Sequence, residues 1–215
     1  DSGFRQHNFG YLDTAQAVLM REPNLYEDNE IRALIESIKY QRLFSVFLTE
    51  HNIFGFSDLN IFDSPQSRQS IVVLLFKCFS IDLAIDIMKH YSLNVRSVGR
   101  SLADALINED SSINNFFIRL QGKDLFREMS FVILNRAYFI FSEKEKVLYI
   151  VKNIINDQSF KCSLFLMFDR LDLAFETAEK YCLLNDYPLI GRKAFKEGNL
   201  VIYNKVMKLI KLNLK

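Results

Sequence analysis

The chain has 215 residues, and its 27 Lys and Arg side chains balance 26 Asp and Glu to a formal net charge of +1. That balance excludes a polycation that coats nucleic acid, and the apolar content of 49% excludes a disordered chain. With only 7 glycines, a fold that depends on many tight turns or phosphate-binding loops is disfavoured.

Helical periodicity runs through nearly the whole chain, and the alternation typical of strands is almost absent. The longest apolar run, residues 71–76, is much shorter than the roughly 20 residues that cross a bilayer. The pattern predicts helices over a segment from Leu12 that Pro23 closes, over 31–48 (as one helix or as two that meet near Tyr40), and over 65–79, 81–91, 95–107, 113–120, 125–141, 147–155, 159–168, 171–184, 189–195 and 200–212.

Several residues predict where these helices begin, end or weaken. Ser64 precedes a proline, which is typical of an N-cap followed by the first helical residue. Ser142 and Glu145 have the spacing of a capping box, in which each side chain satisfies a free backbone N–H. Gly122 is expected to end one helix, and Gly99 to be a weak point inside another.

Two segments of the chain are similar to each other. Residues 81–93 and 171–183 share Leu, Ala, Tyr and Leu at an offset of 90. The helices before them match at an offset of 89, which implies one extra residue in the second turn. An offset of 90 is twice a two-helix unit of about 45 residues, and the small Ala84 and Ala174 should face the preceding helix of their own pair.

We therefore predict an all-α fold, an α-solenoid of stacked antiparallel helical hairpins. The whole chain, residues 1–215, is interpreted as a single solenoid segment of a larger scaffold protein.

Motifs for catalysis or metal binding are missing from the sequence. The three histidines are far apart, and neither a Cys-x-x-Cys pair nor a glycine-rich phosphate-binding string occurs. Cys78, Cys162 and Cys182 lie among large apolar residues, which predicts reduced, mostly buried thiols in a reducing compartment. We expect no cofactor, no metal and no enzymatic activity. An all-α enzyme or a lipid-binding globule is the alternative from another class.

Basic residues concentrate at the C-terminal end. From Leu189 to Lys215, seven Lys or Arg residues stand against Glu197 alone. The last helix has an apolar stripe formed by Val201, Ile202, Val206, Leu209, Ile210 and Leu212. Its residues Val206, Leu209 and Ile210 should pack on the preceding helix, with the lysines at the outer edge. These cations have two interpretations. They form a face that binds an acidic partner or an anionic membrane surface, or they form a solvated cap that complements a helix C-terminus.

The functional interpretation names candidate protein-binding residues in this region. They are Arg192, Lys193, Tyr203, Lys205, Lys208 and Lys211. Binding of nucleic acid is not expected, because Tyr203 is the only aromatic residue of the basic last helix.

Closely spaced aromatic residues need a second explanation. Phe116 and Phe117, and likewise Tyr138, Phe139 and Phe141, are too close together to share one helical face. Either helices pack on both sides of them, as in an array, or some of them form an exposed patch that binds a partner.

The stretch from Leu171 to Tyr181 resembles the helical arrays of coat, tether and nuclear-pore scaffolds. With the run from Leu189 to Phe195 and the basic helix after it, the chain is most similar to the C-terminal helical region of the sixteenth class C vacuolar sorting subunit or its shorter metazoan relative. This resemblance implies a subunit of the HOPS and CORVET tethers that docks a Sec1/Munc18-like protein for SNARE-dependent fusion.

The same resemblance implies a location in the cytoplasm, peripheral on late endosome, lysosome or vacuole membranes through the complex. It lends no catalytic residues. A segment of a nuclear-pore or coat scaffold is the alternative within the same class.

Overall fold

The computed structural model describes residues 29–56, 59–107 and 110–213, together with residues 14, 17, 18 and 21. Every regular element in the segments from residue 29 onward is a helix, so the predicted all-α fold is confirmed. The helix expected between Leu12 and Pro23 falls largely outside the described residues.

From Pro65 onward, the helices follow one another with short connections. They are α2 (Asn29–Glu50), α3 (Pro65–Lys77), α4 (Ile81–His90), α5 (Val95–Leu106), α6 (Asp110–Leu120), α7 (Phe126–Phe139), α8 (Lys144–Asn153), α9 (Gln158–Met167), α10 (Leu171–Lys180), α11 (Tyr187–Lys196) and α12 (Leu200–Asn213). The helix α2 runs unbroken through Tyr40, so the alternative of two helices meeting there is wrong.

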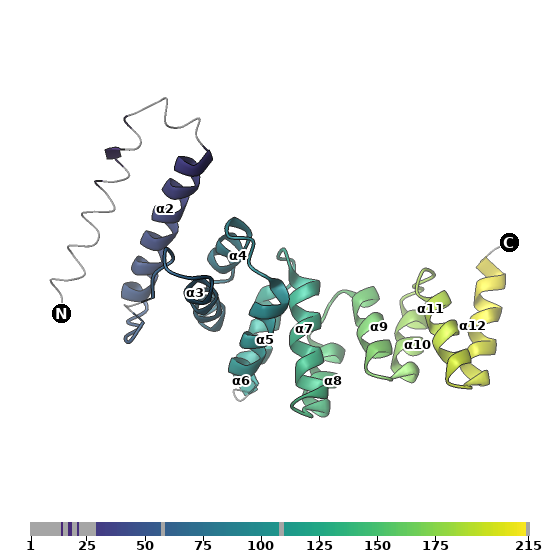
Figure 1. Ribbon diagram of the computed structural model, residues 1–215. Coiled ribbons are helices and arrows are strands. Elements are labelled where there is room, and N and C mark those ends of the chain that lie inside the picture. The colour runs from purple at the N-terminus through teal and green to yellow at the C-terminus, as the bar shows by residue number, and fades with distance from the viewer. Residues whose placement is uncertain are drawn as a thin grey trace.

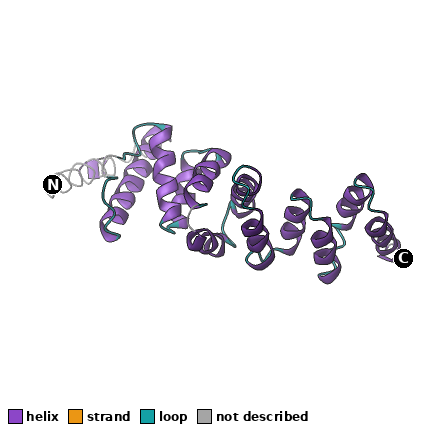
Figure 2. Cartoon of the chain, turned by 90° about the horizontal axis from the view of Figure 1, so that it is seen from below, coloured by secondary structure: helices purple, strands orange, loops and turns teal. Residues whose placement is uncertain are grey.

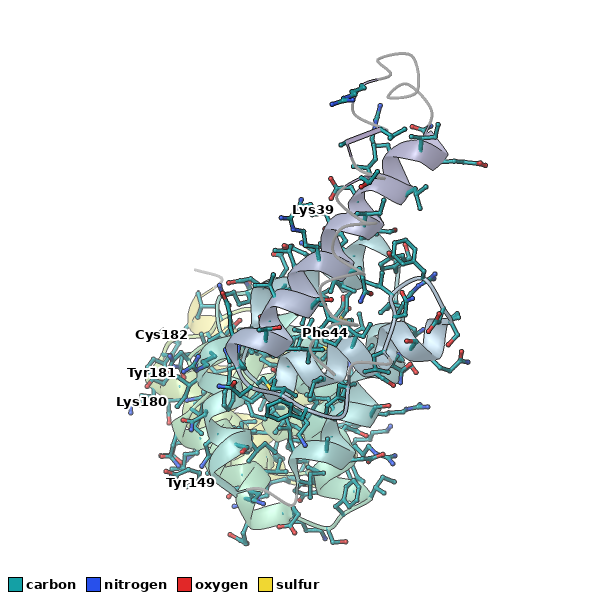
Figure 3. The ribbon with its side chains drawn as sticks, turned by 90° about the vertical axis from the view of Figure 1, so that its left-hand side faces the viewer. Lys39, Phe44, Tyr149, Lys180, Tyr181 and Cys182 are labelled. Atoms are coloured by element: carbon teal, nitrogen blue, oxygen red, sulfur yellow. The ribbon has the colours of Figure 1, made fainter. Side chains whose placement is uncertain are left out.

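The helices stack as antiparallel hairpins in an elongated array, with α2 and α12 at its opposite ends (Figures 1 and 2). Extensive contacts join α3 to α4, α9 to α10 and α11 to α12, and α5 packs along α7 of the next hairpin. Figure 3 looks along the array from its N-terminal end, where Phe44 anchors α2 in the core with no exposed surface. This is the predicted α-solenoid architecture.

Buried apolar side chains from successive helices form one continuous core. Phe116 and Phe117 are both fully buried, and the Phe116 ring lies edge-on to Phe76 with 5.9 Å between centroids. Packing of helices on both sides of α6 therefore buries both phenylalanine rings. Phe139 and Phe141, by contrast, keep 50% and 37% of their surface exposed.

Two hairpins repeat the same turn. Three residues join α3 to α4, and three join α9 to α10. The Ser80 amide donates to the Leu75 carbonyl over 2.9 Å, and the Arg170 amide donates to the Phe165 carbonyl over 2.9 Å. This bond closes a Schellman motif, which terminates a helix with a left-handed residue. The two turns therefore have equal length.

The offset of 89 expected for the first helices of these pairs is wrong. The left-handed residue is Phe79 in one turn and Asp169 in the other, at φ of +61° and +55°, so the first helices also repeat at 90. The first helices have apolar residues at adjacent positions, so their sequences also match when they are aligned one residue out of register. Ala84 and Ala174 are both fully buried, and the Cys162 thiol on α9 lies 3.5 Å from the Ala174 carbonyl oxygen.

The two predicted N-terminal caps have opposite outcomes. Ser64 accepts a hydrogen bond from the Ser67 amide over 3.1 Å, as the sequence predicts. The capping box is wrong, because α8 begins at Lys144 and the side chain of Glu143 makes no capping bond. An N-cap residue has an extended backbone, whereas Ser142 has a φ of +59° in the turn after α7.

Gly99 is a close-packing position rather than a weak point. A Cβ atom at this residue would lie 2.9 Å from Cγ1 and 3.1 Å from Cβ of Val132 on α7. The missing side chain therefore allows α5 and α7 to approach closely. Gly122, at a φ of +75°, follows α6 as predicted.

The thiols are only partly as expected. All three cysteines are free; Cys162 is buried, Cys78 is half-buried and Cys182 is exposed. Burial, with a smaller effect of Asp186, raises the pKa of Cys162 to about 12. Cys182 is the left-handed residue that ends α10, at a φ of +51°, and it lies with Lys180 and Tyr181 at one edge of the molecule (Figure 3). A turn at the edge of the array leaves its thiol in solvent.

Candidate protein-binding surfaces

The C-terminal hairpin α11–α12 carries all six predicted binding residues, at the yellow end of Figure 1. Its helices meet where Val206, which is fully buried, packs on Gly191; a Cβ atom at Gly191 would lie 3.1 Å from Cγ1 of Val206. Leu209 and Ile210 are half-buried against the core. Val206, Leu209 and Ile210 therefore face inward, in the predicted orientation. Val201 and Leu212, which the sequence pattern assigns to the same stripe, are instead 69% exposed.

The three lysines of α12 are exposed. Lys205, Lys208 and Lys211 form no ion pair with a described residue. Lys205 leans back across the hairpin, with its Nζ 5.7 Å from the ring centroid of Phe175 on α10.

Large apolar side chains accompany these lysines on α12. Leu200, Val201 and Leu212 are 60%, 69% and 69% exposed. The outward surface of α12 thus combines cations with exposed aliphatic groups, a composition typical of binding surfaces rather than of a purely solvated cap.

Lys193, one of the six predicted residues, forms two ion pairs within the chain. The Lys193 ammonium binds Asp169 at 2.5 Å and Glu197 at 2.9 Å. The bond to Asp169, then that to Glu197, raises the pKa of Lys193. Lys193 thus fastens α11 to the turn between α9 and α10 instead of offering a free charge.

Tyr203 is half-buried and packs beside Phe195 of α11, with 5.4 Å between ring centroids. It therefore faces the preceding helix and does not interleave with the lysines. Arg192 is exposed on α11. Of the predicted set, Arg192 and the three lysines of α12 are the basic residues without an ion pair among the residues that the structure describes.

A second surface, which the sequence reasoning missed, lies along α5 and α7. It is an open groove of about 930 Å³ to which Phe160 of α9 also contributes. Its charged lining residues are Arg96, Arg100, Arg127, Glu128 and Arg136. The one sequence signal was the spacing of Arg96 and Arg100, four residues apart and thus on one helical face.

Two of the four arginines are held by carboxylates. Arg136 on α7 binds Asp104 on α5 at 2.5 Å, and Arg127 binds Asp157 at 2.5 Å. Burial acts to raise the pKa of Asp157, but hydrogen bonds from the Phe160 amide and from Arg127 outweigh it, so this pKa lies below its usual range. Both ion pairs tie neighbouring hairpins together.

The described residues contain no cluster of three or more His, Cys, Asp or Glu side chains that is arranged to hold a metal ion. Within the same segments, no helix has the length and apolar character required to span a bilayer. Comparison of the chain with models of protein families, with curated proteins and with solved structures gave no significant match.

Proposed function

We propose that the chain is a non-catalytic protein-binding scaffold of a vesicle-tethering complex in endolysosomal trafficking, and that α12 docks a Sec1/Munc18-like partner. The observation that carries this proposal is the outward surface of α12, where three lysines that form no ion pair with a described residue lie among exposed aliphatic side chains. An array of hairpins offers an extended surface, and a few basic and apolar anchors on it supply the affinity.

The packing of α12 separates its structural side from its binding side. Burial of a side chain such as Val206, which is fully buried, stabilises by roughly 1.5–3 kcal/mol. An exposed charge contributes less than about 1 kcal/mol through any pair that it forms. The lysines are therefore available to a partner, and changing them should leave the hairpin folded.

The test is charge reversal of the three lysines, Lys205→Glu, Lys208→Glu and Lys211→Glu, in the full chain. Binding to a purified Sec1/Munc18-family subunit of a tethering complex is measured by biolayer interferometry at two salt concentrations. We expect the variant to lose association rate mainly at low salt, because exposed interface charges steer encounter. Its melting temperature should be close to that of the unmodified chain.

A matched control places the same charge change elsewhere on the array. Lys144, Lys152 and Lys180 are exposed lysines of α8 and α10, and reversing them should leave binding intact. If the α12 variant binds as well as the control at low salt, its lysines are a solvated cap and the proposed docking face is wrong. If the unmodified chain does not bind the Sec1/Munc18-family subunit, the assignment to a tether is wrong.

Scattering in solution distinguishes this scaffold from the globular alternative. A compact chain of this length has a radius of gyration of about 17 Å. The elongated array of Figure 1 should exceed that value clearly. A measured value at the compact limit would contradict a scaffold that acts through an extended surface.

A further inference from the structure

We propose that the groove along α5 and α7 is a docking site for an acidic amphipathic helix of a partner protein. The groove lies in the middle of the array, apart from α12, so this inference goes beyond the proposed role of the C-terminal hairpin and does not depend on it.

The close approach of two helices forms the floor of the groove. Gly99 of α5 faces Val132 of α7, and Asp104 binds Arg136 one helical turn further along. Both pairs advance together along the chain, so α5 and α7 run side by side in the same direction. The groove extends over α7 from Arg127 to Ile140, which corresponds to about 20 Å of helix, the length of a partner helix of about 14 residues.

Apolar side chains and arginines both line the groove. Phe131 is 47% exposed and Ile140 is 64% exposed. Arg96 and Arg100 are exposed on the opposite wall and form no ion pair with a described residue. An apolar strip beside guanidinium groups matches a helix that carries an apolar stripe flanked by carboxylates.

The carboxylates around the groove favour an acidic amphipathic helix over a partner with uniform negative charge, such as a nucleic acid or an anionic membrane. Glu128 lines the groove, and Asp104 and Asp157 hold two of its arginines. A nucleic acid or an anionic membrane would bring phosphates against these three carboxylates as well as against the free arginines. A helix instead places its Asp and Glu side chains over Arg96 and Arg100 alone.

The test is a selection of peptides against the intact chain. A display library of helical peptides of about 14 residues is enriched on the unmodified chain, with counter-selection on a variant carrying Arg96→Glu and Arg100→Glu. The enriched peptides should carry an apolar stripe flanked by Asp or Glu. The dissociation constant of a synthetic consensus peptide should rise at least about tenfold on the charge-reversed variant, and also on Phe131→Ala.

A matched control reverses two exposed basic residues away from the groove and from α12. Lys152 of α8 and Lys180 of α10 are both exposed, and their reversal should leave the dissociation constant unchanged. A milder variant, Arg96→Gln with Arg100→Gln, removes the charges without adding new ones and should weaken binding in the same direction. Circular dichroism of each variant verifies that the helices are intact.

Three outcomes would overturn the proposal. The first is a selection that enriches no acidic amphipathic sequence. The second is a consensus peptide that binds the groove variants and the unmodified chain equally. The third is binding of the unmodified chain to phosphatidylserine vesicles that is lost with Arg96→Glu and Arg100→Glu, because this would make the groove a lipid site.

Discussion

Substitution of Gly99 by alanine tests the close packing of α5 on α7. The new Cβ atom would lie 2.9 Å from Cγ1 and 3.1 Å from Cβ of Val132. A change of the valine rotamer moves Cγ1 away but leaves Cβ in place, because Cβ is attached to the backbone. The two helices must therefore separate by a few tenths of an ångström to accommodate even the small side chain of alanine.

Two opposing effects set the magnitude for Gly99→Ala. Alanine is a better helix former than glycine by about 1 kcal/mol, whereas overpacking of a close contact costs about 1–3 kcal/mol. We expect a net loss of about 1 kcal/mol in the free energy of unfolding. Val132→Ala removes Cγ1 at 2.9 Å but leaves Cβ at 3.1 Å, so in that background Gly99→Ala should be close to neutral, because the gain in helix propensity offsets the contact that remains.

The assay is a double-mutant cycle followed by urea denaturation and the helical circular dichroism signal. The two substitutions should couple by about 1–2 kcal/mol, as residues in contact do. Gly191→Ala is a milder comparison, because its Cβ would meet Val206 at 3.1 Å and no second atom closer than 3.9 Å. If the Gly99→Ala and Val132→Ala effects add without coupling, or if Gly99→Ala alone stabilises, the close approach of α5 and α7 is refuted.

Three further predictions concern single side chains. A polar maleimide should label Cys182 in the native chain and reach Cys162 only on unfolding, since Cys162 is buried with a pKa of about 12; mass spectrometry of rapid native labelling at Cys162 would contradict this. The pKa of Asp157 is lower in the folded chain than in the unfolded chain. Its ionised carboxylate therefore stabilises the fold above the unfolded pKa of about 3.9, and this stabilisation is lost as the pH falls through the folded pKa. In denaturation experiments, the free energy of unfolding of Asp157→Asn should therefore fall less below about pH 4 than that of the unmodified chain. Ser64→Ala should lower the free energy of unfolding by about 1 kcal/mol because it removes an N-cap bond. Ser142→Ala should change it hardly at all in the same denaturation assay, because α8 has no such side-chain bond. Equal losses for the two variants would refute the difference between the two caps.

The sequence alone was enough to predict the helices, their pairing in hairpins and the Ser64 N-cap of α3. An apolar stripe at helical spacing is a local property that needs burial whatever its neighbour is, so the order of helices was predictable. The Ser64 cap was predictable for the same reason, since its bond to Ser67 spans three residues. The inward position of Val206 on α12 followed because burial of its stripe outweighs exposed charge.

Features that depend on residues far apart in the chain were decided only by the tertiary structure. Local pattern alone does not distinguish Lys193, which binds Asp169 24 residues away, from Lys205, whose ammonium lies over the ring of Phe175. Arg136 and Asp104 meet across 32 residues, and the arginine-lined groove exists only because α5 and α7 pack side by side. Whether a side chain is exposed or paired depends on which neighbour packing brings to it, and no spacing within one helix carries that information.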